Sequence, residues 1–222
     1  MVQHAKVLAA TALALLAGIV AAGCGVQVET DGPHTVQTRP VSHFDNVELD
    51  GSTNVVVRRG SSRTLTIEGG RHRVDNVVTR VHDGTLVVGR HDSSGTIELG
   101  GDDATVTVWT PRLSGARIEG SGDLSLPDLD GGSLRLLTNG SGDIDAKGRL
   151  DRLDAGVNGS GDLGLGDVVA QSAAISVSGS GDADVHAVRA LDATVNGSGD
   201  IRYRGDPSLT RQVSGSGSVT SG

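Results

Sequence analysis

The sequence has few aromatic residues and a single cysteine. Phenylalanine, tyrosine and tryptophan each occur once in 222 residues. A globular domain of this length normally fills its core with aromatic rings. The composition therefore favours a narrow fold that packs Val, Ile, Leu and Ala. Because Cys24 is the only cysteine, an internal disulfide is excluded, and the fold must be stable through packing and hydrogen bonds alone.

Basic residues are also scarce relative to acidic ones. The chain has 19 Lys and Arg against 27 Asp and Glu, a net charge of −8. Removal of residues 1–23 would take away Lys6 and no acid, which leaves a net charge of −9. An acidic chain that is poor in aromatic residues disfavours nucleic acid as a partner. It also disfavours electrostatic adsorption to anionic lipid.

Glycine is abundant, with 34 residues, and part of it lies in a repeated motif. Gly-Ser-Gly-Asp occurs five times, and a sixth copy, Gly215-Ser216-Gly217-Ser218, has Ser in place of Asp. The steps between the Asp residues are 20, 19, 20 and 18 residues, and 18 more lead to Ser218. A fixed period of this length is typical of stacked-repeat architectures. The five Asp residues are Asp123, Asp143, Asp162, Asp182 and Asp200.

Apolar residues alternate with polar ones on both sides of each motif, as in strands with one buried face. We therefore predict that each repeat is a strand, a Gly-Ser-Gly corner, a second strand and a connector. The fold class is all-β, a β-helix or β-solenoid of about six rungs stacked roughly 4.8 Å apart. A disordered glycine-rich chain is the alternative, and the strict period argues against it. Two further apolar stripes are predicted in the connectors: Leu129, Leu150, Val168 and Val188, and Leu134, Leu153, Ala173 and Leu191.

The N-terminal 40 residues have a different character. An uncharged apolar run from Val7 to Ala22 predicts that residues 1–23 are a secretory signal peptide. The sequence Ala21-Ala22-Gly23-Cys24 resembles the lipobox of bacterial lipoproteins, in which the cysteine becomes the lipidated N-terminus. Ordinary cleavage with an incidental cysteine is the alternative. Residues 24–40 are polar, contain Asp31-Gly32-Pro33 and are predicted to be a tether to the membrane.

Residues 41–222 are predicted to form one domain, with an irregular part at 41–115 and the regular repeats at 116–222. The irregular part contains a degenerate corner, Gly51-Ser52-Thr53-Asn54, and a hairpin signal at Asp83-Gly84. Further strands are predicted at Thr64–Glu68 and Thr105–Trp109, and no helix is predicted after the signal peptide. We expect this part, with Phe44 and Trp109, to cap one end of the solenoid, because terminal repeats must hide an open edge.

Taken together, these motifs resemble a known family. The opening Phe44-Asp45-Asn46-Val47, the Gly-Ser-Gly-Asp repeats, and the ending Tyr203-Arg204-Gly205-Asp206-Pro207 followed by Val213-Ser214-Gly215-Ser216-Gly217 resemble the putative auto-transporter adhesin head GIN domain family. The resemblance covers about residues 41–222. It implies a β-helix-like fold in a bacterial envelope protein, often a lipoprotein. It implies no catalytic residues.

Stacking would place the five Asp residues in one column, about 5 Å apart. One interpretation is a cation site, because Ca²⁺ prefers carboxylate and backbone oxygens. The other interpretation is structural, because Asp and Ser hydrogen-bond backbone N–H groups at corners. The known calcium solenoid motif has a nine-residue period with an additional Gly-Gly pair, which this sequence lacks. The structural interpretation is therefore preferred, and no cofactor is required.

Catalysis and metal binding elsewhere are less favoured. A polysaccharide-active β-helix enzyme would need acids and bases clustered in a cleft, whereas the arginines near the repeats lie in or near connectors. The histidines at positions 34, 43, 72, 82 and 91 form a loose group that resembles solvated loop positions more than a metal site.

The sequence therefore predicts a non-catalytic, lipid-anchored module on the outer side of a bacterial cell membrane. Its repeated polar faces suit repetitive ligands such as cell-wall glycan, or the edge of an envelope protein. A calcium-stabilised version of the same module is the first alternative, and an enzyme is the second.

Overall fold

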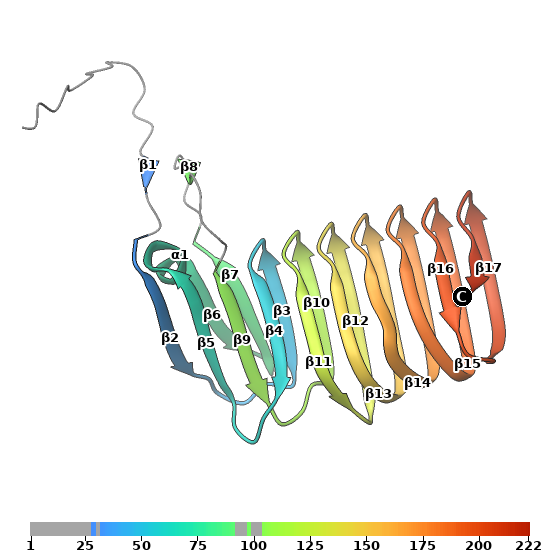
Figure 1. Cartoon of the computed structure of the whole chain (residues 1–222), viewed down its shortest axis with the longest axis horizontal. Coiled ribbons are helices and arrows are strands. Elements are labelled where there is room, and N and C mark those ends of the chain that lie inside the picture. Colours follow the sequence, from blue (N-terminus) through green and yellow to red (C-terminus); the bar gives the residue numbers. More distant parts are fainter. Residues whose placement is uncertain (1–27, 30–31, 92–96, 99–103) are drawn as a thin grey trace, which may run out of the picture.

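The computed structural model describes residues 28–29, 32–91, 97–98 and 104–222. This part of the chain is a β-solenoid, seen from the side in Figure 1, with strands stacked along one long axis. The all-β solenoid predicted from the sequence is confirmed. The predicted signal peptide and Cys24 lie outside the described residues. Within those residues, no helix is long and apolar enough to cross a membrane.

The regular stack begins at residue 115, and its rungs pair in parallel. Gly120 pairs with Gly140, Gly140 with Gly159, and Gly159 with Gly179, so that equivalent residues lie over one another. Three of its strands are long because each crosses from one face of a rung, through the connector, to the first face of the next. The strands are β10 (Gly115–Gly120), β11 (Leu124–Asp130), β12 (Ser133–Gly140), β13 (Ile144–Gly159), β14 (Leu163–Gly179), β15 (Ala183–Gly197), β16 (Ile201–Arg204), β17 (Ser208–Gly215) and β18 (Val219–Ser221).

The core of this stack consists of columns of small and medium apolar side chains. One such column lies five positions before each Asp and is buried at every rung, whereas Val213, at the same offset from Ser218, is 41% exposed. Val157 and Val177 are 1% and 0% exposed, and they pair in register. Burial of alternate aliphatic side chains on both faces stabilises the core, in place of the aromatic rings that the sequence lacks. The column consists of Ile118, Thr138, Val157, Val177 and Val195.

Of the two predicted connector stripes, one is confirmed and one is wrong. Leu134, Leu153, Ala173 and Leu191 are buried and pair in register. The other set splits, because Leu150 pairs with Ala170 and Val168 pairs with Gly148. Ala187 takes the inward position in the last connector, and Val188 is 39% exposed. The physical reason is that rungs of unequal length need register shifts in the connectors, which move the inward position by a residue.

The N-terminal part begins with one rung that is continuous with the stack. Strand β3 pairs in parallel with β10, and β4 pairs in parallel with β11, so the degenerate corner at Gly51 lies beneath Gly120. Strands β7 and β9 extend this rung in parallel, and β2, β5 and β6 are antiparallel. The elements are β1 (Val28–Glu29), β2 (His34–Pro40), β3 (Asn46–Gly51), β4 (Asn54–Arg59), β5 (Thr64–Gly70), α1 (Arg71–Asn76), β6 (Val77–His82), β7 (Thr85–Arg90), β8 (Ile97–Glu98) and β9 (Thr105–Thr110).

Two predictions for the N-terminal part need correction. His34–Pro40, placed in the tether by the sequence, is strand β2 and pairs antiparallel with β5. Its alternation was hidden because β2 lies at the end of the sheet path and buries none of its side chains fully. The short helix α1 was also not predicted. It follows Gly69-Gly70, buries Val74 and leads into β6, which begins at Val77.

The other N-terminal predictions agree with the structure. Asp83 and Gly84 both have positive φ, at 48° and 72°, and join β6 to β7 as an antiparallel hairpin. Phe44 is fully buried in the core. The N-terminal strands and α1 lie together at one end of the stack (Figure 1).

Candidate functional site

Each Gly-Ser-Gly corner needs both of its glycines, for two different reasons. The first glycine has positive φ, for example 144° at Gly159, which side-chain-bearing residues rarely adopt. The second glycine is required by close stacking. A Cβ on Gly161 would lie 2.2 Å from the carbonyl oxygen of Gly142 in the rung before. The corners therefore stack backbone on backbone.

The Asp residues of the motif form a hydrogen-bonded ladder. The backbone N–H of Asp162 donates to Oδ1 of Asp143 at 2.7 Å, and the N–H of Asp182 donates to Oδ1 of Asp162 at the same distance. The N–H of Asp143 and of Asp200 make the equivalent bond to the preceding Asp. The predicted column of Asp123, Asp143, Asp162, Asp182 and Asp200 thus exists, with one carboxylate oxygen of each Asp bound to the backbone of the next rung.

Different residues occupy the two ends of this ladder. Asn54 of the degenerate corner accepts the N–H of Asp123 through Oδ1 at 3.1 Å. At the other end, Ser218 donates both its N–H and its hydroxyl to Oδ1 of Asp200, at 2.8 and 2.9 Å. The Ser218 hydroxyl thus adds a second donor to the oxygen that its own N–H already bonds. Ser in place of Asp in the sixth motif therefore gives the Asp200 carboxylate two hydrogen-bond donors.

The geometry favours the structural interpretation of the Asp column. One carboxylate oxygen of each Asp accepts a backbone N–H, and carboxylate oxygens are the atoms that would coordinate Ca²⁺. Among the residues that the structure describes, no three His, Cys, Asp or Glu side chains gather so that they could hold a metal ion. Of the histidines, His34 lies 3.4 Å from Glu68, and His82 lies 3.1 Å from Asp83.

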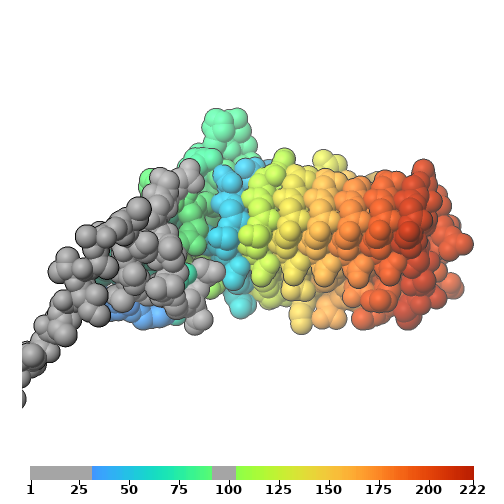
Figure 2. Space-filling view, turned by 90° about the horizontal axis from the view of Figure 1, so that it is seen from above, coloured from blue at the N-terminus to red at the C-terminus, as the bar shows by residue number. Residues whose placement is uncertain are grey.

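The exposed side of the corners forms an even polar surface, which we call the corner edge. Figure 2 looks onto this edge, where equivalent atoms form parallel rows along the stack. One row is the exposed serines of the motifs, and the first three side chains of the row beside it are joined by hydrogen bonds. Asn158 donates through Nδ2 to Oδ1 of Asn139, and Asn139 donates through its own Nδ2 to Oε1 of Glu119. Both distances are 2.8 Å. The serines are Ser121, Ser141, Ser160, Ser180, Ser198 and Ser216.

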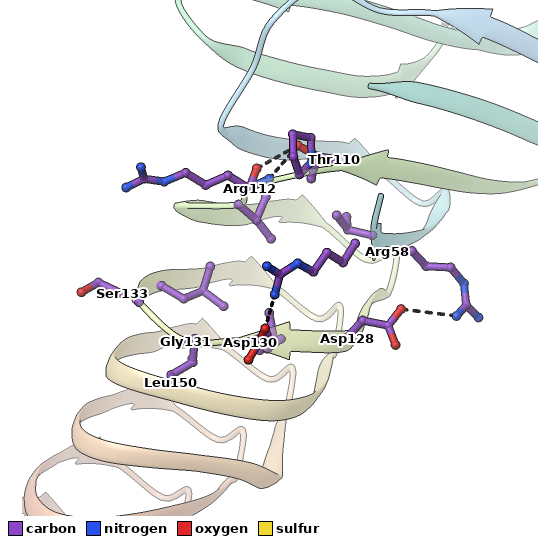
Figure 3. A pocket seen from close by; sticks show the side chains of 15 residues that line it. Arg58, Thr110, Arg112, Asp128, Asp130, Gly131, Ser133 and Leu150 are labelled. Atoms are coloured by element: carbon purple, nitrogen blue, oxygen red, sulfur yellow. Dashed lines mark hydrogen bonds and ion pairs between the residues drawn. The ribbon is translucent and has the colours of Figure 1, made fainter. Parts of the chain in front are cut away.

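A first groove, of about 300 Å³, lies where the N-terminal part meets the regular stack. We call it the Pro111 groove. Figure 3 shows its walls, in which Arg58 is paired with Asp128 at 3.6 Å, and Arg59 is paired with Asp130. Arg112 points away from these pairs, and its guanidinium forms no ion pair within the described part of the chain.

A second groove, of about 610 Å³, lies on the outer face of β3, β10, β12 and β13. We call it the Gly115 groove, after one of its lining residues. Its walls include Arg117, Arg135 and Arg152. The two grooves share Ser133 and Leu134, so they adjoin around the connection between β11 and β12.

Sequence reasoning found the Asp column and missed both grooves. Their arginines are far apart in the chain and were assigned only to connectors or strands. Pairing register brings them together, and the sequence alone could indicate this only after every repeat had been aligned. Among the described residues, no histidine lines either groove.

Comparison with known proteins identifies the fold and the family. Among the solved structures that are similar to this chain, two align with it over 97% of their own length. A putative adhesin from Bacteroides fragilis has a TM-score of 0.67 with 21% identity over 85% of this chain. A putative lipid binding protein from Parabacteroides distasonis has a TM-score of 0.50 with 23% identity over 86%. No curated protein sequence matches this chain.

The sequence profile described as "Putative auto-transporter adhesin, head GIN domain" matches residues 43–207. This range contains the degenerate corner and five of the six Gly-Ser-Gly corners. The structural neighbours agree with the profile in fold. The chain belongs to the auto-transporter adhesin head GIN domain family.

Proposed function

We propose that this chain is a non-catalytic, lipid-anchored binding module of a bacterial cell envelope, and that its corner edge binds repetitive polar ligands such as cell-wall glycan. The adhesin family supports a binding module and an exported or surface location. The observation that carries the ligand class is the corner edge itself, where an exposed Ser side chain recurs at every rung, about 4.8 Å apart. A ligand with regular hydroxyl groups can bond to several rungs at once.

Ligand binding is tested by retention on insoluble cell-wall material. The mature chain, residues 25–222, is incubated with peptidoglycan and with cell-wall polysaccharide, each with Ca²⁺ and with chelator. Retention without Ca²⁺ is expected. No retention on either material contradicts the glycan proposal and points to a protein partner, which crosslinking on the cell surface would then identify.

A matched pair of variants locates the binding surface. Ser160→Arg with Ser180→Arg changes two exposed positions on the corner edge, and Thr210→Arg with Thr220→Arg changes two exposed positions away from it. Both pairs add the same charge. We expect the serine pair to lose retention and the threonine pair to keep it. Equal behaviour of the two pairs contradicts the assignment of the corner edge.

The calcium alternative is tested by the same retention assay and by melting. If Ca²⁺ binds the Asp column, both retention and the melting temperature rise with Ca²⁺ and fall with chelator. The hydrogen-bonded state of every Asp of the ladder leads us to expect no change.

Membrane attachment is proposed through Cys24, which would carry the lipid after cleavage at Gly23. Cells that express the full chain are expected to incorporate labelled fatty acid into it and to retain it in the membrane fraction. Cys24→Ser should abolish labelling and release the protein from that fraction. Labelling that persists in the variant contradicts the anchor.

A further inference from the structure

The arginines of the two grooves form a local positive surface on an acidic protein. The linings of the Pro111 groove and the Gly115 groove together contain six arginines and four acids, a local charge of +2. The whole chain carries −8. The arginines are Arg58, Arg59, Arg112, Arg117, Arg135 and Arg152, and the acids are Glu48, Asp128, Asp130 and Asp154.

Three of these arginines lie on one diagonal across consecutive rungs. Arg117 pairs in register with Leu137, so Arg135 lies one strand further and two residues earlier. Arg135 pairs with Asp154, so Arg152 repeats the same step. One strand is about 4.8 Å and two residues are about 6.6 Å, which gives roughly 8 Å between neighbouring arginine Cα atoms. The Cα atoms of the three arginines are therefore regularly spaced.

These guanidinium groups can be reached by a ligand, and the one that is paired with Glu119, that of Arg117, belongs to a side chain that is 48% exposed. Among the described residues, Arg152 and Arg112 form no ion pair through their side chains, and both are exposed. Arg135 pairs with Asp154 at 3.1 Å, and its side chain is 78% exposed. Exposed ion pairs are weak and exchange readily, so a ligand anion can compete for Arg135.

We propose that the Gly115 groove and the adjoining Pro111 groove form one track that binds a linear anionic polymer of the cell envelope. Each repeat unit of such a polymer presents a carboxylate or a phosphodiester, and arginine binds both groups through paired N–H donors. Regular spacing of the arginines matches a polymer better than a single small anion. This surface is distinct from the corner edge and does not depend on it.

The proposal is tested by direct binding of three probes to the purified mature chain. The probes are polygalacturonate, which carries carboxylates, deacylated poly(glycerol phosphate), which carries phosphodiesters, and neutral dextran. At least one anionic probe is expected to bind, more weakly as salt increases, and dextran is expected not to bind. The stronger of the two anionic probes identifies the anion. No binding of either anionic probe at low salt overturns the proposal.

Charge-matched variants separate this track from non-specific attraction. Arg112→Gln and Arg152→Gln each remove an unpaired guanidinium from the track, and each is expected to weaken binding about tenfold. Arg202→Gln removes the same charge from exposed strand β16, outside both grooves, and is expected to change affinity little. Equal affinities for Arg152→Gln and Arg202→Gln overturn the proposal. The serine pair that tests the corner edge should bind these probes normally, so failure of one site is distinguishable from failure of the other.

Discussion

The regular stack and the N-terminal part of the same sheet are stabilised by different groups. In the stack, glycine lets backbone contact backbone, and each Asp bonds the next rung in the same way. In the N-terminal part, the side-chain contacts are not repeated from one strand to the next. Arg39 of β2, for example, donates to the Val77 carbonyl of β6 at 2.9 Å and to Thr79 Oγ1 at 3.2 Å. A residue whose contact is repeated in every rung tolerates little substitution, because the neighbouring rungs must keep the same geometry. A residue whose contact occurs once can be substituted without affecting the other contacts.

The two ends of the solenoid show the same contrast on a smaller scale. At the N-terminal end, Arg39 connects β2 and β6 through two good hydrogen bonds. At the C-terminal end, Arg211 occupies an inward column position beside Ala193 and reaches only the Val219 carbonyl, at 3.5 Å. An inward-pointing charge is a known way to protect a sheet edge from pairing with other chains. The N-terminal end is therefore the more firmly closed of the two.

The largest expected difference between the parts comes from a charge placed in each. Val177→Asp puts a carboxylate into a fully buried column of the stack and should prevent folding, with a loss above about 4 kcal/mol. Val36→Asp in β2, at a position that is 58% exposed, should change stability by less than about 0.5 kcal/mol. Thermal unfolding followed by circular dichroism measures both. A normal melt for Val177→Asp would show that the inward face is assigned wrongly.

The next largest effect is expected from an added methyl group at a corner. Gly181→Ala would place a Cβ 1.9 Å from the Gly161 carbonyl oxygen, so two rungs must separate, at roughly 3 kcal/mol or more. Gly89→Ala in β7 meets the Asp50 carbonyl oxygen at 3.2 Å and should lose much less. Urea unfolding of both variants measures the loss of stability at each position. Similar midpoints would mean that close stacking is not special to the regular corners.

A smaller effect is expected from the arginines at the two ends. Arg39→Ala removes the two hydrogen bonds to β6, together with two exposed ones to Gln37 Oε1, and should lower the free energy of unfolding by about 1–2 kcal/mol. Arg211→Ala removes one long bond and should lower it by less than about 0.5 kcal/mol. Urea titration is the measurement. A larger loss for Arg211→Ala would reverse the ranking of the two ends.

One substitution is expected to stabilise the stack. Thr138 lies in the column of Ile118 and Val157, and its Oγ1 is buried without a hydrogen-bond partner. Thr138→Val keeps the shape and removes the unsatisfied hydroxyl, which should add about 1 kcal/mol. Thr194→Val, at a position in the same stack that is only partly buried, should show no such gain. A lower melting temperature for Thr138→Val would indicate that its hydroxyl has a partner in solution.

The smallest effect is expected in the Asp ladder. In Asp162→Asn, the amide oxygen can still accept the N–H of Asp182, so stability should change by less than about 0.5 kcal/mol. Asp162→Ala removes that acceptor and should lose about 1 kcal/mol. If Asn proves as damaging as Ala, the negative charge matters and the calcium alternative gains support.

Much of the regular stack could be predicted from the sequence, because each repeat carries the same information. The spacing of Val157 and Val177 predicted both the strand and the column that the structure contains. The N-terminal part was harder, because each element there occurs once. Strand β2 looks polar since it is an outer strand, and α1 has six residues, too few for a helical period to be visible.

The sequence by itself determined the solenoid, its polar corner edge and the Asp column, because strict periodicity converts sequence position directly into position in space. Only the tertiary structure decided which residues are neighbours in adjacent rungs of unequal length. It paired each carboxylate with the next backbone N–H. It also turned Val188 outward and brought Arg117, Arg135 and Arg152 onto one diagonal. Those outcomes depend on strand register, which is set by the packing of whole rungs and not by any one repeat.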